Sequence, residues 1–183
     1  MPVPAMNVMP ALRWHDTPER FGIISLLLHW GIAVLFAVQF TCVIIRRSGG
    51  EFSMQLHKEV GLLILILTVI RIFWALFNWK NRPGHTKNLL GLLAVCGHFS
   101  LYILMFFVPA MAMLRQIGSG RAFSFFGIPV TQNTGVQVEW MTAPASMLHG
   151  IAGWLLLLLI LGHIAMAFYH QFVLKDNLML RMR

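Results

Sequence analysis

Four long apolar runs constrain this chain more than any other feature of its sequence. They cover residues 21–45, 56–79, 89–114 and 147–174. Each run is close to or above the roughly 20 residues that a helix needs to cross the hydrocarbon of a bilayer. Charged residues make up only 11% of the chain, against about a quarter in soluble domains. The pattern predicts an all-α membrane protein, an antiparallel bundle of four transmembrane helices in a single domain over residues 1–183.

The segments outside these runs are short. Residues 1–20 combine prolines with mixed charges and predict a loose tail. The first run is much longer than the roughly 7–15 residues of a signal-peptide core, so we expect it to remain in the protein as a helix. Residues 115–144 form the largest connection, and their glycines and aromatic residues predict a segment that folds over the outer surface.

Basic residues predict the orientation. Four spans place both termini on one side of the membrane, together with the second connection. That side carries eight basic residues: Arg13, Arg20, Lys80, Arg82, Lys87, Lys175, Arg181 and Arg183. The opposite side carries five: Arg46, Arg47, Lys58, Arg115 and Arg121. The positive-inside rule therefore predicts a multi-pass membrane protein with both termini in the cytoplasm. These charges flank apolar spans and form no clustered motif, so we expect no nucleic-acid partner.

Histidines are the candidates for chemistry. Five of the eight lie inside or at the ends of the apolar runs: His29, His57, His98, His149 and His163. An ionisable residue inside a membrane is costly, which makes it a functional candidate. For any one of them alone, a hydrogen bond to a neighbouring helix is an equally good explanation.

Spacing sorts four of these histidines into two pairs. His149 and His163 are 14 residues apart, which places them within about 40° on one helix face and roughly 21 Å apart along the axis. The first span runs outward and brings His29 to the depth of His163. The second span runs inward and starts with His57 at the depth of His149. We call His29 with His163 the inner pair, and His57 with His149 the outer pair.

Paired imidazoles favour haem over other metals. Two axial imidazoles fill both open positions of a haem iron, which suits electron transfer. Zinc would need about four ligands at one point, and no Cys-x-x-Cys-His motif is present for covalent haem attachment. The sequence therefore predicts two non-covalent b haems with these four histidines as iron ligands. Nearby glycines would leave room for the macrocycle or, equally, allow close helix packing: Gly61, Gly150, Gly153 and Gly162.

Arg71 and His98 lie at the depth of the inner pair. Arg71 follows His57 by 14 residues on nearly the same face. No acidic residue lies in the spans at that depth, so a haem propionate is the expected partner of Arg71, in preference to snorkelling toward the cytoplasm. For His98 we expect a hydrogen bond to a propionate or a neighbouring helix rather than ligation of iron.

The order and spacing of these residues resemble the bacterial cytochrome b561 family from about Arg20 to the C-terminus. The matching features in the spans are Leu28-His29-Trp30, Leu56-His57 with Gly61 and Arg71, Gly97-His98 with Tyr102, and His149 with His163. The ending also matches, in Phe168-Tyr169-His170-Gln171-Phe172, Lys175-Asp176-Asn177 and Leu180-Arg181-Met182. The resemblance implies a four-helix membrane protein with two non-covalent b haems, held by histidines of the first, second and fourth helices.

The resemblance also implies an activity. Members of this family pass electrons to or from quinone in the bacterial inner membrane, and the small bacterial forms include enzymes that oxidise superoxide and reduce ubiquinone. The five basic residues of the outer side would form a positive field over the outer pair and attract a small anion. An oxidoreductase that transfers electrons from superoxide, or another small redox donor, to ubiquinone is the favoured function.

A passive electron-transfer subunit that anchors a partner redox protein is the alternative. A helical bundle without haem would be recognised by the absence of b-haem absorption bands.

Overall fold

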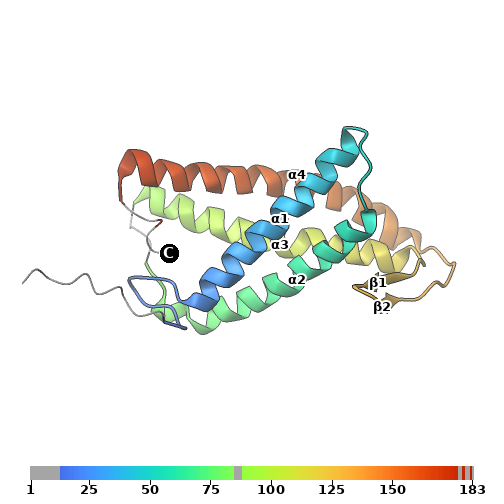
Figure 1. Cartoon of the computed structure of the whole chain (residues 1–183), viewed down its shortest axis with the longest axis horizontal. Helices are drawn as coiled ribbons and strands as arrows, with labels where there is room; N and C mark the ends of the chain where they lie inside the picture. The colour runs from blue at the N-terminus through green and yellow to red at the C-terminus, as the bar shows by residue number, and fades with distance from the viewer. Residues whose placement is uncertain (1–12, 85–87, 177–178, 180–181, 183) are drawn as a thin grey trace, which may run out of the picture.

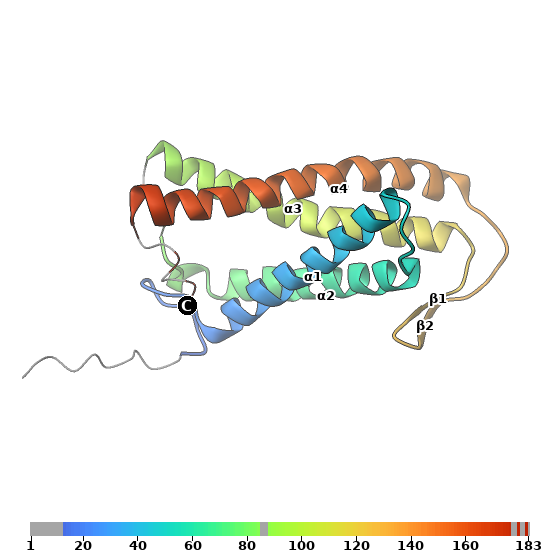
Figure 2. The ribbon, with the colours of Figure 1, turned by 45° about the horizontal axis from the view of Figure 1, so that its top comes forward.

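The computed structural model describes residues 13–84, 88–176, 179 and 182. Residues 1–12 of the predicted tail lie outside this part of the chain, as do the basic residues Lys87, Arg181 and Arg183. Four helices run the length of the molecule (Figures 1 and 2): α1 (Ile23–Arg47), α2 (Met54–Phe77), α3 (Leu89–Gly118) and α4 (Glu139–Phe168). A 3₁₀ turn, η1 (Trp79–Asn81), follows α2, and a π-helical turn, η2 (Tyr169–Leu174), continues α4.

The four helices are each long and apolar enough to cross a membrane. This confirms the predicted all-α bundle with four spans. Neighbouring helices in the sequence pack against one another, α1 along α2, α2 along α3 and α3 along α4. Among the described residues, α1 and α4 make no comparable backbone contact. Contacts between α1 and α4 are therefore made mainly by side chains.

The start of α4 differs from the expectation. The helix begins at Glu139, well before residue 147, because its first two turns are too polar to be recognised by apolarity. Glu139 lies in the first turn, where a carboxylate is favoured by the helix dipole. The Thr142 hydroxyl donates to the carbonyls of Val138 and Glu139. The connection between α3 and α4 is correspondingly shorter than predicted.

That connection forms a β-hairpin that lies against α2. Strands β1 (Phe123–Phe125) and β2 (Ile128–Thr131) pair in antiparallel fashion, with positive φ at both Phe126 and Gly127 in the turn. Gln55 Nε2 donates to the Ser124 carbonyl at 2.8 Å. The Phe126 amide donates to Glu59 Oε1 at 3.3 Å. The hairpin is therefore fixed to the first turns of α2, on both sides of His57.

A layer of apolar side chains fills the centre of the bundle. On α4, Ala152 and Leu156 are buried between His149 and His163. The same layer receives buried side chains from the other three helices, Ile32, Phe36, Val60, Ile64, Leu101, Met105 and Val108. The hydrophobic core therefore separates the depth of the outer pair from that of the inner pair.

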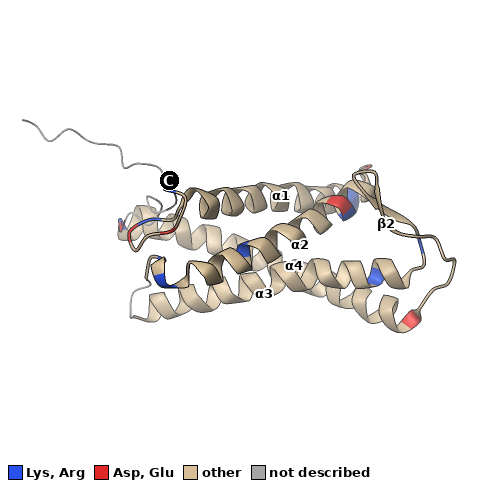
Figure 3. Cartoon of the chain, turned by 90° about the horizontal axis from the view of Figure 1, so that it is seen from below, with Lys and Arg blue, Asp and Glu red and all other residues tan. Residues whose placement is uncertain are grey.

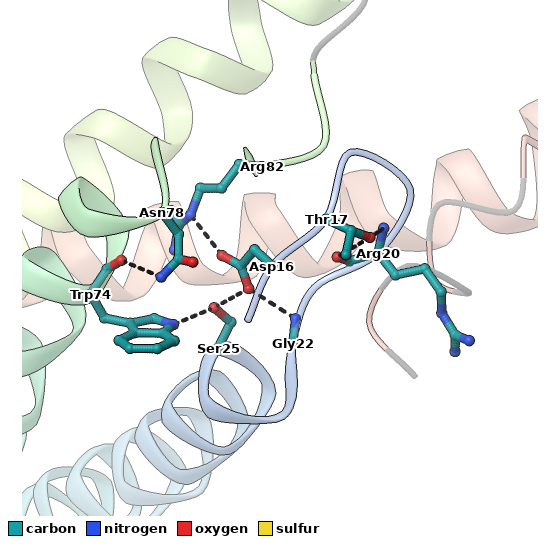
Figure 4. Close-up of polar contacts among 8 residues, drawn as sticks. All are labelled: Asp16, Thr17, Arg20, Gly22, Ser25, Trp74, Asn78 and Arg82. Atoms are coloured by element: carbon teal, nitrogen blue, oxygen red, sulfur yellow. Dashed lines mark hydrogen bonds and ion pairs between the residues drawn. The ribbon is translucent and has the colours of Figure 1, made fainter. Parts of the chain in front are cut away.

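The segment before α1 is not loose where the structure describes it. Asp16 is only 3% exposed, and its carboxylate accepts hydrogen bonds from the Gly22 amide, the Ser25 hydroxyl and Arg82 Nε at 2.8, 2.6 and 3.1 Å. Trp74 Nε1 donates to the same Ser25 hydroxyl at 3.0 Å (Figure 4). The expectation of a loose tail is wrong for residues 13–20, because one buried acid ties them to α1 and to the end of α2.

Replacing Asp16 with Ala should destabilise the protein by about 3 kcal/mol, because the Arg82, Ser25 and Gly22 donors lose a shared buried acceptor. Arg82 is partly exposed, so water can solvate it and the loss should fall at the low end of the range for buried pairs. Unfolding in mixed detergent micelles measures the change. Glu19→Ala removes an exposed acid of the same segment and should alter stability by less than about 0.5 kcal/mol. Equal effects of the two substitutions would contradict this role of Asp16.

Candidate haem sites

The structure brings the predicted histidine pairs together. The ring centroids of His57 on α2 and His149 on α4 are 6.2 Å apart, with an interplanar angle of 85°. Those of His29 on α1 and His163 on α4 are also 6.2 Å apart, at 70°. The inner pair therefore brings side chains of α1 and α4 together, although the backbones of these two helices are not in close contact.

These separations fit a metal between two imidazoles. Two metal–nitrogen bonds of about 2 Å in line, with about 1 Å from each nitrogen to its ring centre, put the centres about 6 Å apart. A Cβ added at Gly150 or at Gly162 would meet nothing within 4 Å, and both glycines are exposed. Both pairs therefore have the spacing that a bis-histidine haem requires.

His149 is oriented by the backbone of α3. Its Nδ1 lies 2.9 Å from the Val108 carbonyl oxygen. Since a carbonyl can only accept, Nδ1 carries the hydrogen and Nε2 is left with a free lone pair. A metal-bound histidine commonly has this arrangement, with the second ring nitrogen donating to a fixed acceptor.

His57 has a different neighbour, the side-chain amide of Gln39 on α1. Gln39 Nε2 lies 3.3 Å from His57 Nε2 and donates to the His57 carbonyl at 3.1 Å. Two buried atoms of this contact, His57 Nδ1 and Gln39 Oε1, have no hydrogen-bond partner in the described structure. Each such atom costs roughly 1–3 kcal/mol.

Arg71 lies at the inner pair, as its position in α2 predicts. Its guanidinium donates to His29 Nδ1 at 2.9 Å and lies 5.5 Å from the centre of the Tyr102 ring. In the part of the chain that the structure describes, no carboxylate forms an ion pair with Arg71. Because a guanidinium only donates, this contact leaves the hydrogen of a neutral His29 on Nε2, so the ring could bind iron there only when Arg71 has turned to another partner, such as an acidic group of a cofactor.

His98 on α3 is the third histidine at the inner depth. Its ring centroid is 5.2 Å from that of His163, less than the roughly 6 Å that two in-line metal bonds require. The separation between His29 and His163 fits a metal better. His170, in η2, hydrogen-bonds through Nδ1 to Asp176 Oδ2 at 2.6 Å and lies outside both pairs.

The five basic residues predicted for the outer side are all exposed, and they lie at the ends of helices or in the hairpin connection. Figure 3 shows Lys and Arg gathered mainly toward the ends of the bundle. Arg47 lies over the Trp154 ring at 5.2 Å, and Lys58 lies over the Phe123 ring at 6.0 Å. Within the described residues, none of the five makes an ion pair.

Sequence analysis did not identify Gln39 or the Val108 carbonyl as parts of the outer site. Gln39 did leave a signal, because it is an amide inside a long apolar run, where a polar side chain needs a partner. The Val108 carbonyl left no signal in the sequence, because every residue has a backbone carbonyl and only the tertiary fold brings this one to His149.

Known proteins share this pattern over nearly the whole chain. The profile of a family described as prokaryotic cytochrome b561 matches residues 20–183. Cytochrome b561 homolog 2 of Escherichia coli (strain K12) is 31% identical over 178 residues, which are 91% of this chain and 93% of that protein. Cytochrome b562 of Cereibacter sphaeroides is 33% identical over 172 residues, 87% of this chain and 92% of that protein.

A more distant relative has a name that states an activity. The probable superoxide oxidase CybB of Yersinia pestis is 23% identical over 171 residues, 90% of this chain and 96% of that protein. Together with four helices that can span a bilayer, the matching profile leads to one assignment. The chain belongs to the prokaryotic cytochrome b561 family, and is a multi-pass membrane protein that binds haem b and transfers electrons.

Proposed function

We propose that this protein holds two b haems and is a superoxide:ubiquinone oxidoreductase. His57 and His149 would bind the iron of the outer haem, and His29 and His163 that of the inner haem. The observation that carries the two-haem part of the proposal is the equal ring separation of 6.2 Å in two pairs on opposite sides of one apolar layer. Each bound haem supplies an iron that accepts and releases a single electron.

Different residues of the chain contact the two histidine pairs. Val108 and Gln39 contact the histidines of the outer pair, whereas Arg71 contacts the inner pair. Arg71 would hold an acidic edge of the inner haem, because a positive charge in this apolar surrounding stabilises an anion strongly. The buried cluster between the pairs contains aliphatic side chains together with Met105 and Phe36, and the fully buried Thr68 of α2 lies at the same depth as this cluster's inner edge.

The direction of transfer follows from the proposed orientation. The start of α1, the end of α2 and the end of α4 lie at one end of the bundle, which we assign to the cytoplasm of a bacterial inner membrane. The connection between α1 and α2 and the β-hairpin lie at the other end, which would then face the periplasm. Two superoxide ions would each give one electron at the outer side and leave as oxygen. Ubiquinone would take up the two electrons and two protons to form ubiquinol.

Superoxide as the donor is supported by charge and by one relative. Arg46, Arg47, Lys58, Arg115 and Arg121 are exposed at the outer end, and a positive field accelerates the capture of small anions. The name of the Yersinia pestis relative states superoxide oxidation. The names of the relatives that are 31% and 33% identical state only cytochromes, which is equally compatible with a passive carrier that serves a partner redox protein.

Stopped-flow mixing of the oxidised protein with superoxide tests the activity. We expect rapid reduction of b haem, followed by reoxidation when ubiquinone is added, because both half-reactions belong to the proposed cycle. Slow reduction by superoxide combined with rapid reduction by ubiquinol would favour the passive carrier. The measurement follows the α absorption band of the reduced haem.

Single histidine substitutions test the ligands. Each of His29→Ala, His57→Ala, His149→Ala and His163→Ala should retain one of two haems per chain, since each removes one axial bond from one site. Haem is counted against protein by its pyridine derivative, and the spectrum of the remaining haem identifies the site. His15→Ala changes a ring that stacks on Trp74 outside both pairs and should keep two haems. Retention of two haems by His29→Ala, with loss of one in His98→Ala, would assign the inner ligand to His98.

Replacing Arg46, Arg115 and Arg121 together with Gln should slow haem reduction by superoxide about tenfold at low salt, because the steering field is weakened. Arg47 and Lys58 are left unchanged since they also pack on rings. The difference should shrink as salt rises, with a screening length of about 8 Å at physiological ionic strength.

Two matched variants control this measurement. Glu51→Gln removes a negative charge beside Arg46 and should increase the rate at low salt. Lys80→Gln removes an exposed positive charge at the opposite end and should leave it unchanged. An unaltered rate in the triple variant with full haem content would remove the steering argument.

A further inference from the structure

The connection between α3 and α4 presents apolar side chains on its surface. Residues 122–138, which include the β-hairpin, contain no charged side chain. Three of them, Phe126 in the turn and Ile128 and Val130 on β2, are 58%, 65% and 44% exposed. We call these three residues the exposed hairpin face. Neighbouring large apolar side chains on a surface mark a contact with lipid or with another protein, so this face needs an apolar partner.

The other side of the hairpin is already filled by α2. Phe123 of β1 is only 4% exposed, and Lys58 Nζ lies 6.0 Å from the centre of its ring. The backbone of the turn is also bound, because the Phe126 amide donates to Glu59 Oε1 at 3.3 Å. Contact with α2 therefore accounts for one side of the hairpin and leaves the exposed hairpin face for another molecule.

The contact with Glu59 sets the level of the hairpin turn along the bundle. Glu59 comes five residues after Met54, the first residue of α2, which is about 7.5 Å along the helix axis. It also lies inside the apolar run that begins at Leu56. Figures 1 and 2 show the hairpin beside the start of α2, whereas the chain that leaves β2 extends beyond the ends of the helices. The turn therefore lies at the level where the membrane span of α2 begins.

Lipid fits this level and this composition better than a protein partner. Other apolar side chains at the same end are also exposed, Ile117 of α3 at 53% and Trp140 of α4 at 71%, and tryptophan is enriched where a membrane meets water. Redox partners that are soluble proteins are usually attracted by complementary charge, which residues 122–138 lack. The unpaired backbone groups of a two-stranded hairpin need water, which the headgroup region supplies and the hydrocarbon does not.

We propose that the hairpin is an interfacial anchor, whose exposed face lies among the phospholipid headgroups and the first acyl carbons at this end of the bundle. The inference requires the four membrane spans but no haem ligand, so its failure would leave the proposed function unaffected. Gln55 and Glu59 bind the hairpin on both sides of His57. Lipid contact of the hairpin therefore also steadies the part of α2 that carries one histidine of the outer pair.

Spin labels on single cysteines test the depth of the hairpin in nanodiscs of phosphatidylethanolamine and phosphatidylglycerol. Phe126→Cys, Ile128→Cys and Asn133→Cys are labelled in a Cys96→Ser background, and Cys42 stays because it is buried. The measurement is the ratio of collisions with oxygen, which enters lipid, to collisions with a nickel chelate, which stays in water. The ratio should be several-fold higher at residues 126 and 128 than at residue 133, in the exposed polar part of the connection. A label on the native Cys96, exposed on the α3 span, gives the value for lipid.

Two results would overturn the inference. A ratio at residues 126 and 128 as low as that at residue 133 would place the exposed hairpin face in water. Labels shielded from both reagents would show that a protein surface, such as a second copy of the chain, covers this face instead of lipid. Each labelled protein has to retain the native haem spectrum, and a variant that does not fold is replaced by Val130→Cys, which tests the same face.

A double substitution of Gln55→Ala with Glu59→Ala tests whether α2 sets the depth. It removes both side-chain hydrogen bonds to the hairpin. The label at residue 128 should then become more mobile and its ratio should fall, because a released hairpin samples water as well as lipid. Glu51→Ala with Gln132→Ala removes an exposed acid and an exposed amide at the same end and should change neither quantity. Unchanged mobility and ratio in the first variant would refute this part of the inference.

Discussion

The structure depends on the cost of placing imidazoles in an apolar bundle and on the pairing that offsets this cost. A polar ring inside a membrane needs a partner for each nitrogen. His149 obtains one from a backbone carbonyl of α3, and His29 obtains one from Arg71 of α2. These bonds join different helices, so the demand of each ring for a partner also fixes how neighbouring helices lie. The inner pair joins side chains of α1 and α4 in the same way.

Helix geometry explains why two sites arise from so short a chain. Fourteen residues return an α-helix nearly to the same face, so α4 alone presents His149 and His163 at two depths. α1 and α2 run in opposite directions and each supplies one partner. The apolar layer then fills the interval between the two depths. One helix with two histidines therefore sets the distance between the sites, and the other helices complete them.

Much of this arrangement can be predicted from the sequence, because apolar runs and helical periodicity are local properties. The four spans and the meeting of His57 with His149 follow from length and depth alone. The contacts of Asp16 and of Gln39 do not, because they join residues far apart in the chain through single side chains without a repeating pattern. The early start of α4 was missed for a related reason, since a polar helical turn looks like a loop when apolarity is the criterion.

The apolar layer also has an electrical consequence. Its side chains are apolar, and an electron that crosses between the two depths carries its charge through the part of the membrane that separates them. In the proposed orientation, negative charge travels toward the cytoplasm and adds to a voltage that is already negative inside. Moving one charge through 100 mV takes about 2.3 kcal/mol. Each electron would work against only the fraction of the membrane voltage that falls between the two depths. Electron transfer would then build up the voltage that opposes it, and the turnover rate would fall as the membrane voltage rises.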